Sequence, residues 1–303
     1  MIEISIVVPV YNESENIKPF IERTCKVLDN INKDYEIIFC LDPSSDNTEN
    51  VILEEISRNK KIKLMVFSRK FGQPISTIAG IENTNGKYCV VIDVDLQDPP
   101  ELIEDMYKKI TDENLDVVYA VRKSREGETF IKKMISKFAY KIINYFSDIN
   151  IPVDTGDFRI FSNKIVNELK KFNEKEAFLR GLVAYVGFKQ DKILFDRKER
   201  SHGKSKYNKF TGSFKIGING IVGFSSKPLF LMAILGFTIS FLSFILGFWY
   251  FLQKIIGINL TPGLTTTVIL ISFYSGLQLF GMGMLGEYIG RIYDEVKKRP
   301  RYI

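Results

Sequence analysis

The sequence predicts an α/β domain with a mostly parallel sheet, followed by helices that enter a membrane. Short β-rich runs alternate with segments of helical length through the first 121 residues, which is typical of a parallel sheet with helices on both faces. No charged residue occurs between Lys227 and Lys254, nor from Ile255 to Gly286. Residues 1–118 carry a net charge of −9 and residues 119–303 carry +15. This asymmetry favours a soluble domain that faces an anionic membrane surface.

Five apolar runs are the expected strands, and they alternate little between polar and apolar residues, as strands covered on both faces do. They are ISIVV (4–8), YEIIFC (35–40), IKLMVF (62–67), YCVVID (88–93) and DVVYAV (116–121). Helices are expected at 15–30, 47–58, 74–84 and 100–111, with Ser45 and Asp46 as good N-cap residues for the second of them. In such sheets ligands bind at the carboxyl ends of the strands.

Two later segments predict basic amphipathic helices. In residues 130–146 an apolar side chain recurs every four positions among lysines, and residues 210–221 repeat the apolar pattern. Each segment alone is also compatible with a helix that packs on the core and has a solvated lysine face. Because both precede a long apolar region, we favour a position at the membrane surface.

Two apolar stretches predict membrane-spanning helices. Residues 229–252 would span roughly 36 Å as a helix, against about 30 Å for a hydrocarbon core. Residues 264–286 supply a second stretch of similar length after a turn at 257–263. Lysines before the first stretch and KKRPR (297–301) after the second place both ends on the cytoplasmic side of the cell membrane. We therefore predict a cytosolic α/β domain (1–205), a juxtamembrane amphipathic segment (206–228) and a two-helix transmembrane hairpin with a basic tail (229–303).

An acidic cluster follows the fourth expected strand, in VVIDVDLQDPPE (90–101). Asp93 and Asp95 are two residues apart at a strand end, so both carboxylates can reach one divalent cation or one ligand. Oxygen ligands of this kind suit Mg²⁺ or Mn²⁺, and such an ion commonly bridges to a diphosphate. The motif alone is weak, because acidic residues are common in solvated loops.

The motifs around this cluster carry a resemblance that covers nearly the whole chain. They are SIVVPVYNESENI (5–17), CLDPSSDNT (40–48), SRKFGQPISTIAGIENTNG (68–86), DVDLQDPPE (93–101), DTGDFRIFS (154–162), RSHGKSKYNKF (200–210) and GEYIGRIYDEVKKRPRYI (286–303). In order and spacing they resemble the family 2 glycosyltransferases with a GT-A, Rossmann-like fold. Together with the two-helix tail they resemble the polyprenyl-phosphate glycosyltransferases. These are relatives of dolichol-phosphate mannose synthase that include the bactoprenol glucosyltransferases.

The resemblance implies a role for each matching residue. The residues that bind the nucleotide sugar would be Pro9, Tyr11, Asn12, Glu13, Asp42 and Asp93. Among them, Asp42 would lie against the base and Asp93 at the ribose or the metal-bound phosphate. The metal ligands would be Asp95 and Gln97. Asp157 would be an acid of the catalytic site, together with Asp95 and Asp93, and would orient the acceptor or take a proton. The chain departs from the usual DDGS motif, because Leu41 replaces the first acid and Pro43 the glycine.

Cationic side chains are expected to offset the repulsion between the donor and acceptor phosphates. The candidates are Arg122, Arg125, Arg200, Ser205 and Lys206, since guanidinium groups and hydroxyls suit phosphate oxygens. The alternative is a surface cluster that binds only lipid headgroups. A phosphomonoester acceptor is already anionic near neutral pH, so the reaction needs a strong general base less than transfer to a hydroxyl does.

The resemblance therefore implies an inverting enzyme that moves a hexose, glucose from UDP-glucose in the first instance, onto undecaprenyl or another polyprenyl phosphate in cell envelope glycosylation. Alternatives are mannose transfer from GDP-mannose and a catalytically inactive nucleotide-binding membrane scaffold. The expected partners are the nucleotide sugar, the lipid phosphate and the bilayer, with no nucleic acid, and a homo-oligomer such as a tetramer is expected from the family. The sequence fixes neither the sugar, the base nor the lipid length.

Overall fold

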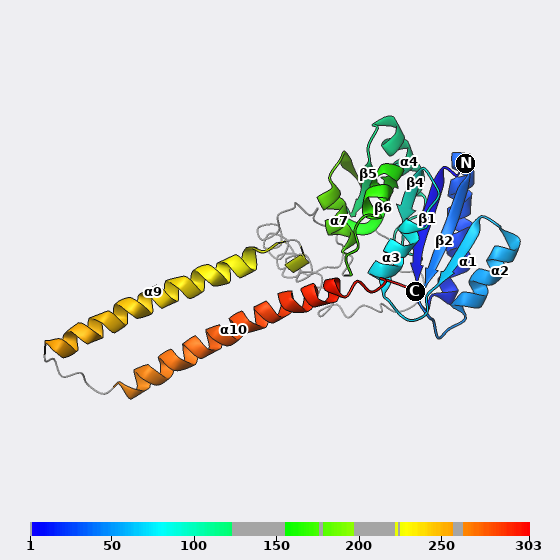
Figure 1. The fold of residues 1–303 in the computed structure, drawn as a ribbon. Helices are drawn as coiled ribbons and strands as arrows, with labels where there is room; N and C mark the ends of the chain where they lie inside the picture. The colour runs from blue at the N-terminus through cyan, green and yellow to red at the C-terminus, as the bar shows by residue number, and fades with distance from the viewer. Residues whose placement is uncertain (1, 123–154, 176–177, 197–221, 224, 257–262) are drawn as a thin grey trace. The chain divides into compact units, whose positions relative to one another are not determined.

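The computed structural model describes residues 2–122, 155–175, 178–196, 222–223, 225–256 and 263–303 (Figure 1). These residues belong to two compact units. One contains the sheet and also residues 300–303, and the other contains the two long helices of the apolar region. The predicted amphipathic segments at 130–146 and 210–221 lie outside the described residues.

The first unit is built on a seven-stranded sheet with the strand order β3-β2-β1-β4-β6-β5-β7. Strand β6 is antiparallel to its neighbours β4 and β5, and every other pair of neighbouring strands is parallel. The mostly parallel sheet predicted from the sequence is therefore confirmed. The strands are β1 (Ile4–Val10), β2 (Tyr35–Leu41), β3 (Ile62–Val66), β4 (Tyr88–Val91), β5 (Val117–Arg122), β6 (Thr155–Ser162) and β7 (Gln190–Phe195).

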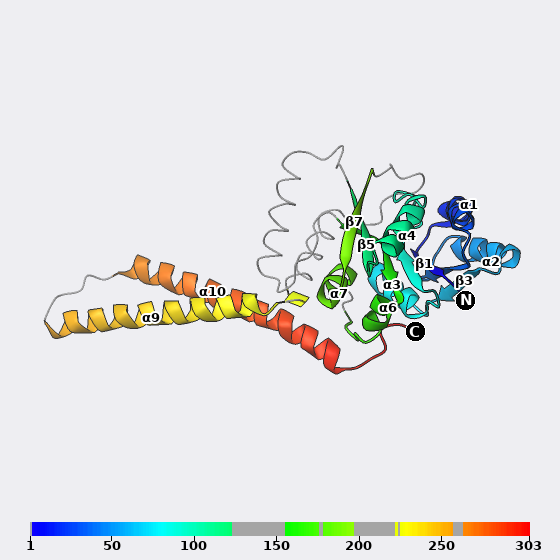
Figure 2. The ribbon, with the colours of Figure 1, turned by 90° about the horizontal axis from the view of Figure 1, so that it is seen from above.

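Helices cover both faces of this sheet (Figure 2). One face packs against α1 (Ser14–Ile31), α2 (Thr48–Arg58) and α4 (Leu102–Asp112), whose apolar side chains join the largest core cluster. The other face carries α3 (Gln73–Glu82), α6 (Asn163–Leu169) and α7 (Leu179–Val186). The four helices expected between the first strands are all present, and no end is shifted by more than two residues.

The start of α2 corrects one detail of the prediction. Its N-cap is Asn47, not Ser45 or Asp46, and Asn47 forms no side-chain cap hydrogen bond. Asp46 nevertheless serves the helix, because its Oδ1 accepts hydrogen bonds from the Thr48 N–H (3.1 Å) and hydroxyl (2.5 Å). Its Oδ2 accepts the N–H of Ser14, the first residue of α1, at 3.1 Å. One carboxylate thus satisfies donors at the N-termini of two helices, where negative charge is favourable.

A glycine lets α3 approach the sheet closely. A Cβ atom at Gly80 would lie 2.3 Å from Val7 Cγ1 and 2.7 Å from Cys40 Sγ. Val7 and Cys40 lie on β1 and β2 and are fully buried. The helix therefore contacts two central strands at a distance that only glycine allows, which fixes its position over the sheet.

The second unit contains α9 (Lys227–Ile255) and α10 (Leu264–Val296), which lie side by side as an antiparallel pair. Ser243 Oγ lies 3.2 Å from Tyr274 Oη, and the Tyr288 hydroxyl donates to the carbonyl oxygen of Ser225 at 2.8 Å. Most of the described apolar side chains of α9 are exposed, with exposed fractions of 75% for Phe237 and 73% for Phe244. Such exposure is unlike that of a helix buried in a protein core and favours contact with lipid.

The hydropathy of the helices supports one membrane span. Residues Lys227–Trp249 have a mean hydropathy of 2.5 and no buried residue, and by length and composition they could cross a bilayer. Among the described residues α9 is the one helix that meets this criterion. The predicted second span at 264–286 lies within α10 and is not confirmed.

We predict that Gly80→Ala destabilises the sheet domain by about 1–3 kcal/mol, because the added methyl group overpacks the contact with Val7 and Cys40. The measurement is thermal unfolding of the purified protein. Gly276→Ala in α10 is the matched control, since among the described residues no atom lies within 4 Å of the added Cβ. An unfolding temperature for Gly80→Ala equal to that of the control would contradict the close packing of α3.

Candidate active site

The direction of the strands gathers the candidate residues at one edge of the sheet. The parallel strands β1, β2, β3, β4, β5 and β7 all end there. Strand β6 runs the other way, so its first residues reach the same edge. Val91 of β4 pairs with Arg159 of β6, which brings Asp93, two residues further along, level with Asp157.

The turn after β1 is attached to the loop after β2. Asn12 has a left-handed backbone (φ 52°), which asparagine tolerates better than most residues. Its N–H donates to Ser44 Oγ at 2.9 Å, and its Oδ1 accepts the Ser45 N–H at 2.7 Å. The N–H of Glu13 donates to Thr48 Oγ1 at 2.9 Å. Two of the predicted nucleotide residues of the first motif, Asn12 and Glu13, are therefore held by the second motif.

Asp42 organises the loop after β3. Its side chain is buried, with 2% exposed. One carboxylate oxygen accepts the N–H of Phe71 at 2.9 Å and the other accepts the N–H of Gly72 at 2.8 Å. Gly72 has φ +89°, a conformation that side chains disfavour. The structure thus gives Asp42 a role in shaping this loop, and its predicted contact with a base stays a prediction.

The same loop reaches the other predicted donor residues. The Lys70 ammonium lies 3.5 Å from the centre of the Tyr11 ring, a cation–π contact. The Gln73 side chain donates from Nε2 to Asp93 Oδ1 at 2.8 Å. Residues 70–73 therefore contact the turn after β1, the end of β2 and the end of β4.

The acidic turn after β4 is strained and fits a divalent cation. Leu96 is buried and has φ +59°, which is costly for a bulky side chain. Asp95 Oδ1 accepts the N–H of Gln97 at 3.1 Å, so both predicted ligands lie on the same tight turn. In the described parts of the chain no group of three His, Cys, Asp or Glu side chains could hold a metal. Two side-chain oxygen ligands suit Mg²⁺ or Mn²⁺, which bind through one or two carboxylates plus substrate phosphates.

Asp98 lies beside the start of β6. Unlike most acidic side chains in loops, it is not exposed to solvent. It is buried, with 4% exposed. A Cβ atom at Gly156 would lie 4.0 Å from Asp98 Oδ2 and 3.7 Å from Arg122 Nη2. Asp98 and the predicted phosphate-binding Arg122 therefore pack against the same residue.

Asp157 is surrounded by arginines. Arg180 donates from Nε to Asp157 Oδ1 at 2.9 Å, and Arg159 and Arg122 add positive charge. Partial burial acts to raise the pKa of Asp157, whose side chain is 31% exposed, but the three guanidinium groups outweigh it and hold that pKa below its ordinary value. Burial lowers the pKa of Arg159 to about 10, so that Arg159 is still charged at neutral pH. Arg159 is itself buried, with 3% exposed, and donates from Nη2 to the Gly156 carbonyl oxygen at 2.7 Å. We call Arg122, Arg159 and Arg180, the three guanidinium groups around Asp157, the arginine cluster.

Sequence reasoning missed several residues of this edge. Arg159 and Arg180 were not predicted, nor were the contacts of Lys70 and Gln73. The motif DTGDFRIFS contains Arg159, whereas nothing in AFLRGL marks Arg180. Of the predicted phosphate-binding set the structure places Arg122 at this edge. Arg125, Arg200, Ser205 and Lys206 lie outside the described residues.

A cavity of about 470 Å³ lies elsewhere, lined by Asp29, Asn32, Lys33, Asp34 and Lys61. The lining residues lie at the end of α1 or just before β2 and β3. The cavity is therefore at the amino ends of the strands. The candidate residues lie at the opposite edge, where ligands of parallel sheets bind.

Comparison with models of protein families identifies the family of this chain. The model described as "Glycosyl transferase family 2" matches residues 5–170, more than half of the chain. The chain belongs to glycosyl transferase family 2. It is a glycosyltransferase, as the sequence motifs predicted.

The sequence of this family 2 glycosyltransferase matches those of curated relatives over nearly its whole length. It is 41% identical to an uncharacterised glycosyltransferase of Synechocystis over 303 residues, 100% of this chain and 94% of that protein. It is 35% identical over 302 residues to the "prophage bactoprenol glucosyl transferase homolog" of Escherichia coli and to the "bactoprenol glucosyl transferase" of Shigella phage SfX. In both cases the match covers 99% of this chain and 98% of the relative.

We predict that Arg180→Gln moves the acidic limb of the pH–rate profile of this glycosyltransferase to higher pH. With the nearest positive charge removed, burial raises the pKa of Asp157. The ionised carboxylate is present above that pKa and is lost as the pH falls through it. The measurement is kcat/KM for sugar transfer from about pH 3 to pH 8, a range that extends below the ordinary pKa of an aspartate, about 3.9.

Arg180→Lys is the matched control, because it keeps a positive charge beside Asp157 and should leave the acidic limb near its original position. An acidic limb that stays unchanged in Arg180→Gln would show that Arg180 does not keep Asp157 ionised.

Proposed function

We propose that this protein is a membrane-bound, inverting glycosyltransferase that moves glucose from UDP-glucose onto a polyprenyl phosphate such as undecaprenyl phosphate, releasing UDP. The observation that carries the proposal is the single sheet edge that combines an acidic turn with an arginine cluster. The acidic turn suits a metal-bound diphosphate, and the arginine cluster suits a second phosphate. The relatives named bactoprenol glucosyl transferase support the same donor sugar and acceptor.

The donor end of the site comprises the turn after β1, Asp42 with its loop, and Asp93. Tyr11 and Lys70 form a stacked pair beside this loop, and Asn12 and Glu13 are fixed by hydrogen bonds to the loop after β2. We assign the nucleoside to this end, next to Pro9 in β1. A divalent cation, Mg²⁺ or Mn²⁺, held by Asp95 and Gln97, would neutralise charge on the leaving diphosphate.

The acceptor end comprises the arginine cluster. In the proposed step a phosphate oxygen of the lipid attacks the anomeric carbon, and the bond from that carbon to the diphosphate oxygen breaks. The attack comes from the side opposite the leaving group, so the configuration inverts. Guanidinium groups bind phosphate oxygens through paired hydrogen bonds, and they offset the repulsion between the two anions. Arg125, Arg200, Ser205 and Lys206 stay part of this proposal.

Asp157 orients the arginine cluster in this proposal rather than acting as a general base. Its carboxylate binds Arg180 directly, and the surrounding arginines hold its pKa below the ordinary value in spite of burial. A carboxylate whose pKa lies below the ordinary aspartate value is a poor base at neutral pH. The acceptor phosphate needs no strong base, because it is already anionic near neutral pH.

The membrane part of the proposal rests on α9 and on the relatives. The exposed apolar surface of α9 is suited to a bilayer, and a lipid acceptor requires an enzyme near the membrane. We propose that 264–286 is a second span and that the sheet domain lies on the cytoplasmic face. Assembly into a homo-oligomer stays a prediction from the sequence.

Mannose transfer from GDP-mannose is the alternative activity, since Leu41 and Pro43 alter the motif predicted to face the base. Leu41 is buried in the core cluster, so the missing acid leaves no gap in the fold. The protein purified in detergent should be incubated with undecaprenyl phosphate and a panel of nucleotide sugars. Release of UDP with formation of glucosyl lipid is expected. Turnover with GDP-mannose alone would favour the alternative, and nucleotide binding without any turnover would favour an inactive scaffold.

We predict that Asp95→Asn abolishes metal-dependent sugar transfer while the protein still folds and enters the membrane. The substitution removes the charge of a proposed metal ligand but preserves its size. Initial rates should be measured across a Mn²⁺ titration, with thermal unfolding as the test of folding.

Asp105→Asn, on the exposed face of α4, is the control and should keep full activity. Substantial turnover by Asp95→Asn at every Mn²⁺ concentration would remove Asp95 from the mechanism.

A further inference from the structure

Residues 301–303, which we call the tail, bind the sheet domain through a set of specific contacts. The Arg301 guanidinium forms an ion pair with Glu82, and the Tyr302 hydroxyl donates to the other Glu82 oxygen at 2.8 Å. The tail also contacts the strand end at β3. The Tyr302 and Phe67 rings meet edge to face at 5.9 Å, and the Ser68 N–H donates to the Ile303 carbonyl at 2.9 Å.

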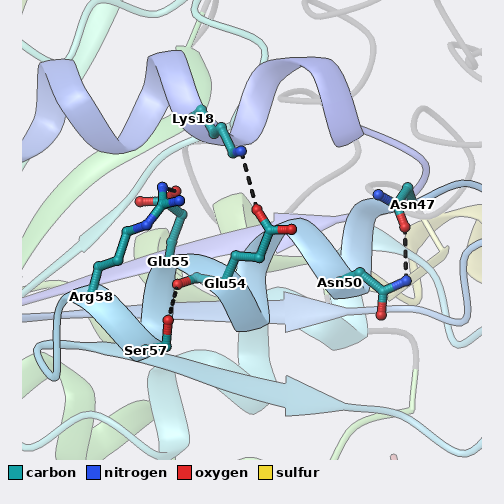
Figure 3. A network of polar contacts seen from close by, with 7 residues as sticks. All are labelled: Lys18, Asn47, Asn50, Glu54, Glu55, Ser57 and Arg58. Carbon is teal, nitrogen blue, oxygen red and sulfur yellow. Dashed lines mark hydrogen bonds and ion pairs between the residues drawn. The ribbon is translucent and has the colours of Figure 1, made fainter.

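Burial distinguishes this attachment from an ordinary surface ion pair. The Arg301 side chain is 9% exposed and that of Glu82 is 16% exposed. On α2, by contrast, Arg58 pairs with Glu55 but is 64% exposed (Figure 3). Exposed pairs contribute little to stability, whereas removal of one partner from a buried pair leaves the other charge uncompensated and is costly. The tail contact is therefore energetically significant.

The tail touches both ends of one structural segment. Phe67 and Ser68 begin the loop that leads into α3, and Glu82 ends that helix. Between these two points lie the groups that contact the donor end of the site. The N–H groups of Phe71 and Gly72 bind Asp42. Further contacts from this segment are Lys70 over the Tyr11 ring and Gln73 on Asp93.

The helical part of this segment is already fixed, because α3 packs on the sheet through Gly80. The loop at 67–72 is anchored at its two ends instead, and Phe67 at its start is buried, with 3% exposed. Its start is held by the Phe67 N–H, which donates to Leu41 at 3.1 Å, and its end by Asp42. The tail adds contacts at Phe67 and Ser68, at the point where the chain leaves the sheet.

We infer that Arg301 and Tyr302 are positioning residues for the donor nucleotide, which act by ordering the loop at 67–72. This inference rests on the proposed function in placing the donor at this edge. The tail follows α10 closely in the sequence, with residues 297–300 between them. The chain that leaves the apolar helices thus returns to the loop that shapes the nucleotide site, so the same segment that continues the membrane hairpin also orders the donor end.

Hydrogen exchange of the full-length protein tests the ordering directly. In Arg301→Met, peptides that cover residues 67–72 should exchange about tenfold faster than in the wild type, since the tail is released. Arg301→Lys should restore most of the protection. Asp42→Asn should expose the same peptides, because it removes the acceptors of Phe71 and Gly72. Arg58→Met, which breaks the exposed pair on α2, is the matched control and should change nothing.

Kinetics then separate positioning from a purely structural role. For Arg301→Met and for Tyr302→Phe, which removes only the hydroxyl, the KM for UDP-glucose should rise by up to about tenfold while kcat stays within about twofold. Unchanged exchange at 67–72 would overturn the inference, as would a fall in unfolding temperature with no change in KM. If the wild type neither binds nor uses UDP-glucose, the proposed function fails, and the exchange of residues 67–72 still decides whether the tail orders the loop.

Discussion

The carboxylate of Asp42 holds together the part of the molecule on which the proposed chemistry depends. It is buried at the end of β2, where a lone charge would be unstable, and two backbone N–H groups compensate it. In accepting them it fixes residues 71 and 72, and through them the position of Lys70 and Gln73. A single buried charge thus joins the end of β2 to the turn after β1 and to the acidic turn after β4.

The reversed direction of β6 brings Asp157 to the same edge of the sheet. A sheet of parallel strands alone would bring only strand ends to this edge. Because β6 is reversed, its first residues arrive there as well, and they carry Asp157. The edge therefore brings the acidic turn after β4 and the arginine cluster to the same end of the sheet. In the proposed reaction the first would hold a metal-bound diphosphate and the second the acceptor phosphate.

Much of the fold could be predicted from the sequence because its signals are local. Apolar runs without alternation identify doubly covered strands such as β1 and β2, and the alternation of strands with helical segments identifies a parallel sheet. The position of Asp42 and Asp93 at strand ends followed from that topology. The N-cap of α2 was misplaced because Asp46 binds the helix from one residue before the cap.

The remaining contacts could not be predicted because they depend on long-range packing or on backbone groups. The partners of Asp42 are N–H groups, which every residue except proline possesses, so no residue type reveals them. Arg180 meets Asp157 only because α7 packs near the reversed strand. The pair formed by Arg301 and Glu82 joins residues 219 positions apart. Nothing in the sequence around either residue indicates that the other is its partner.

The most direct test of the account is a structure of the protein with UDP and Mn²⁺, in which the anomalous signal locates the metal. We predict a manganese ion bound by Asp95 and Gln97, with the diphosphate between it and the arginine cluster and the nucleoside beside the loop at 67–72. Manganese and UDP bound elsewhere, for example in the cavity lined by Asp29 and Asp34 at the opposite edge of the sheet, would contradict it.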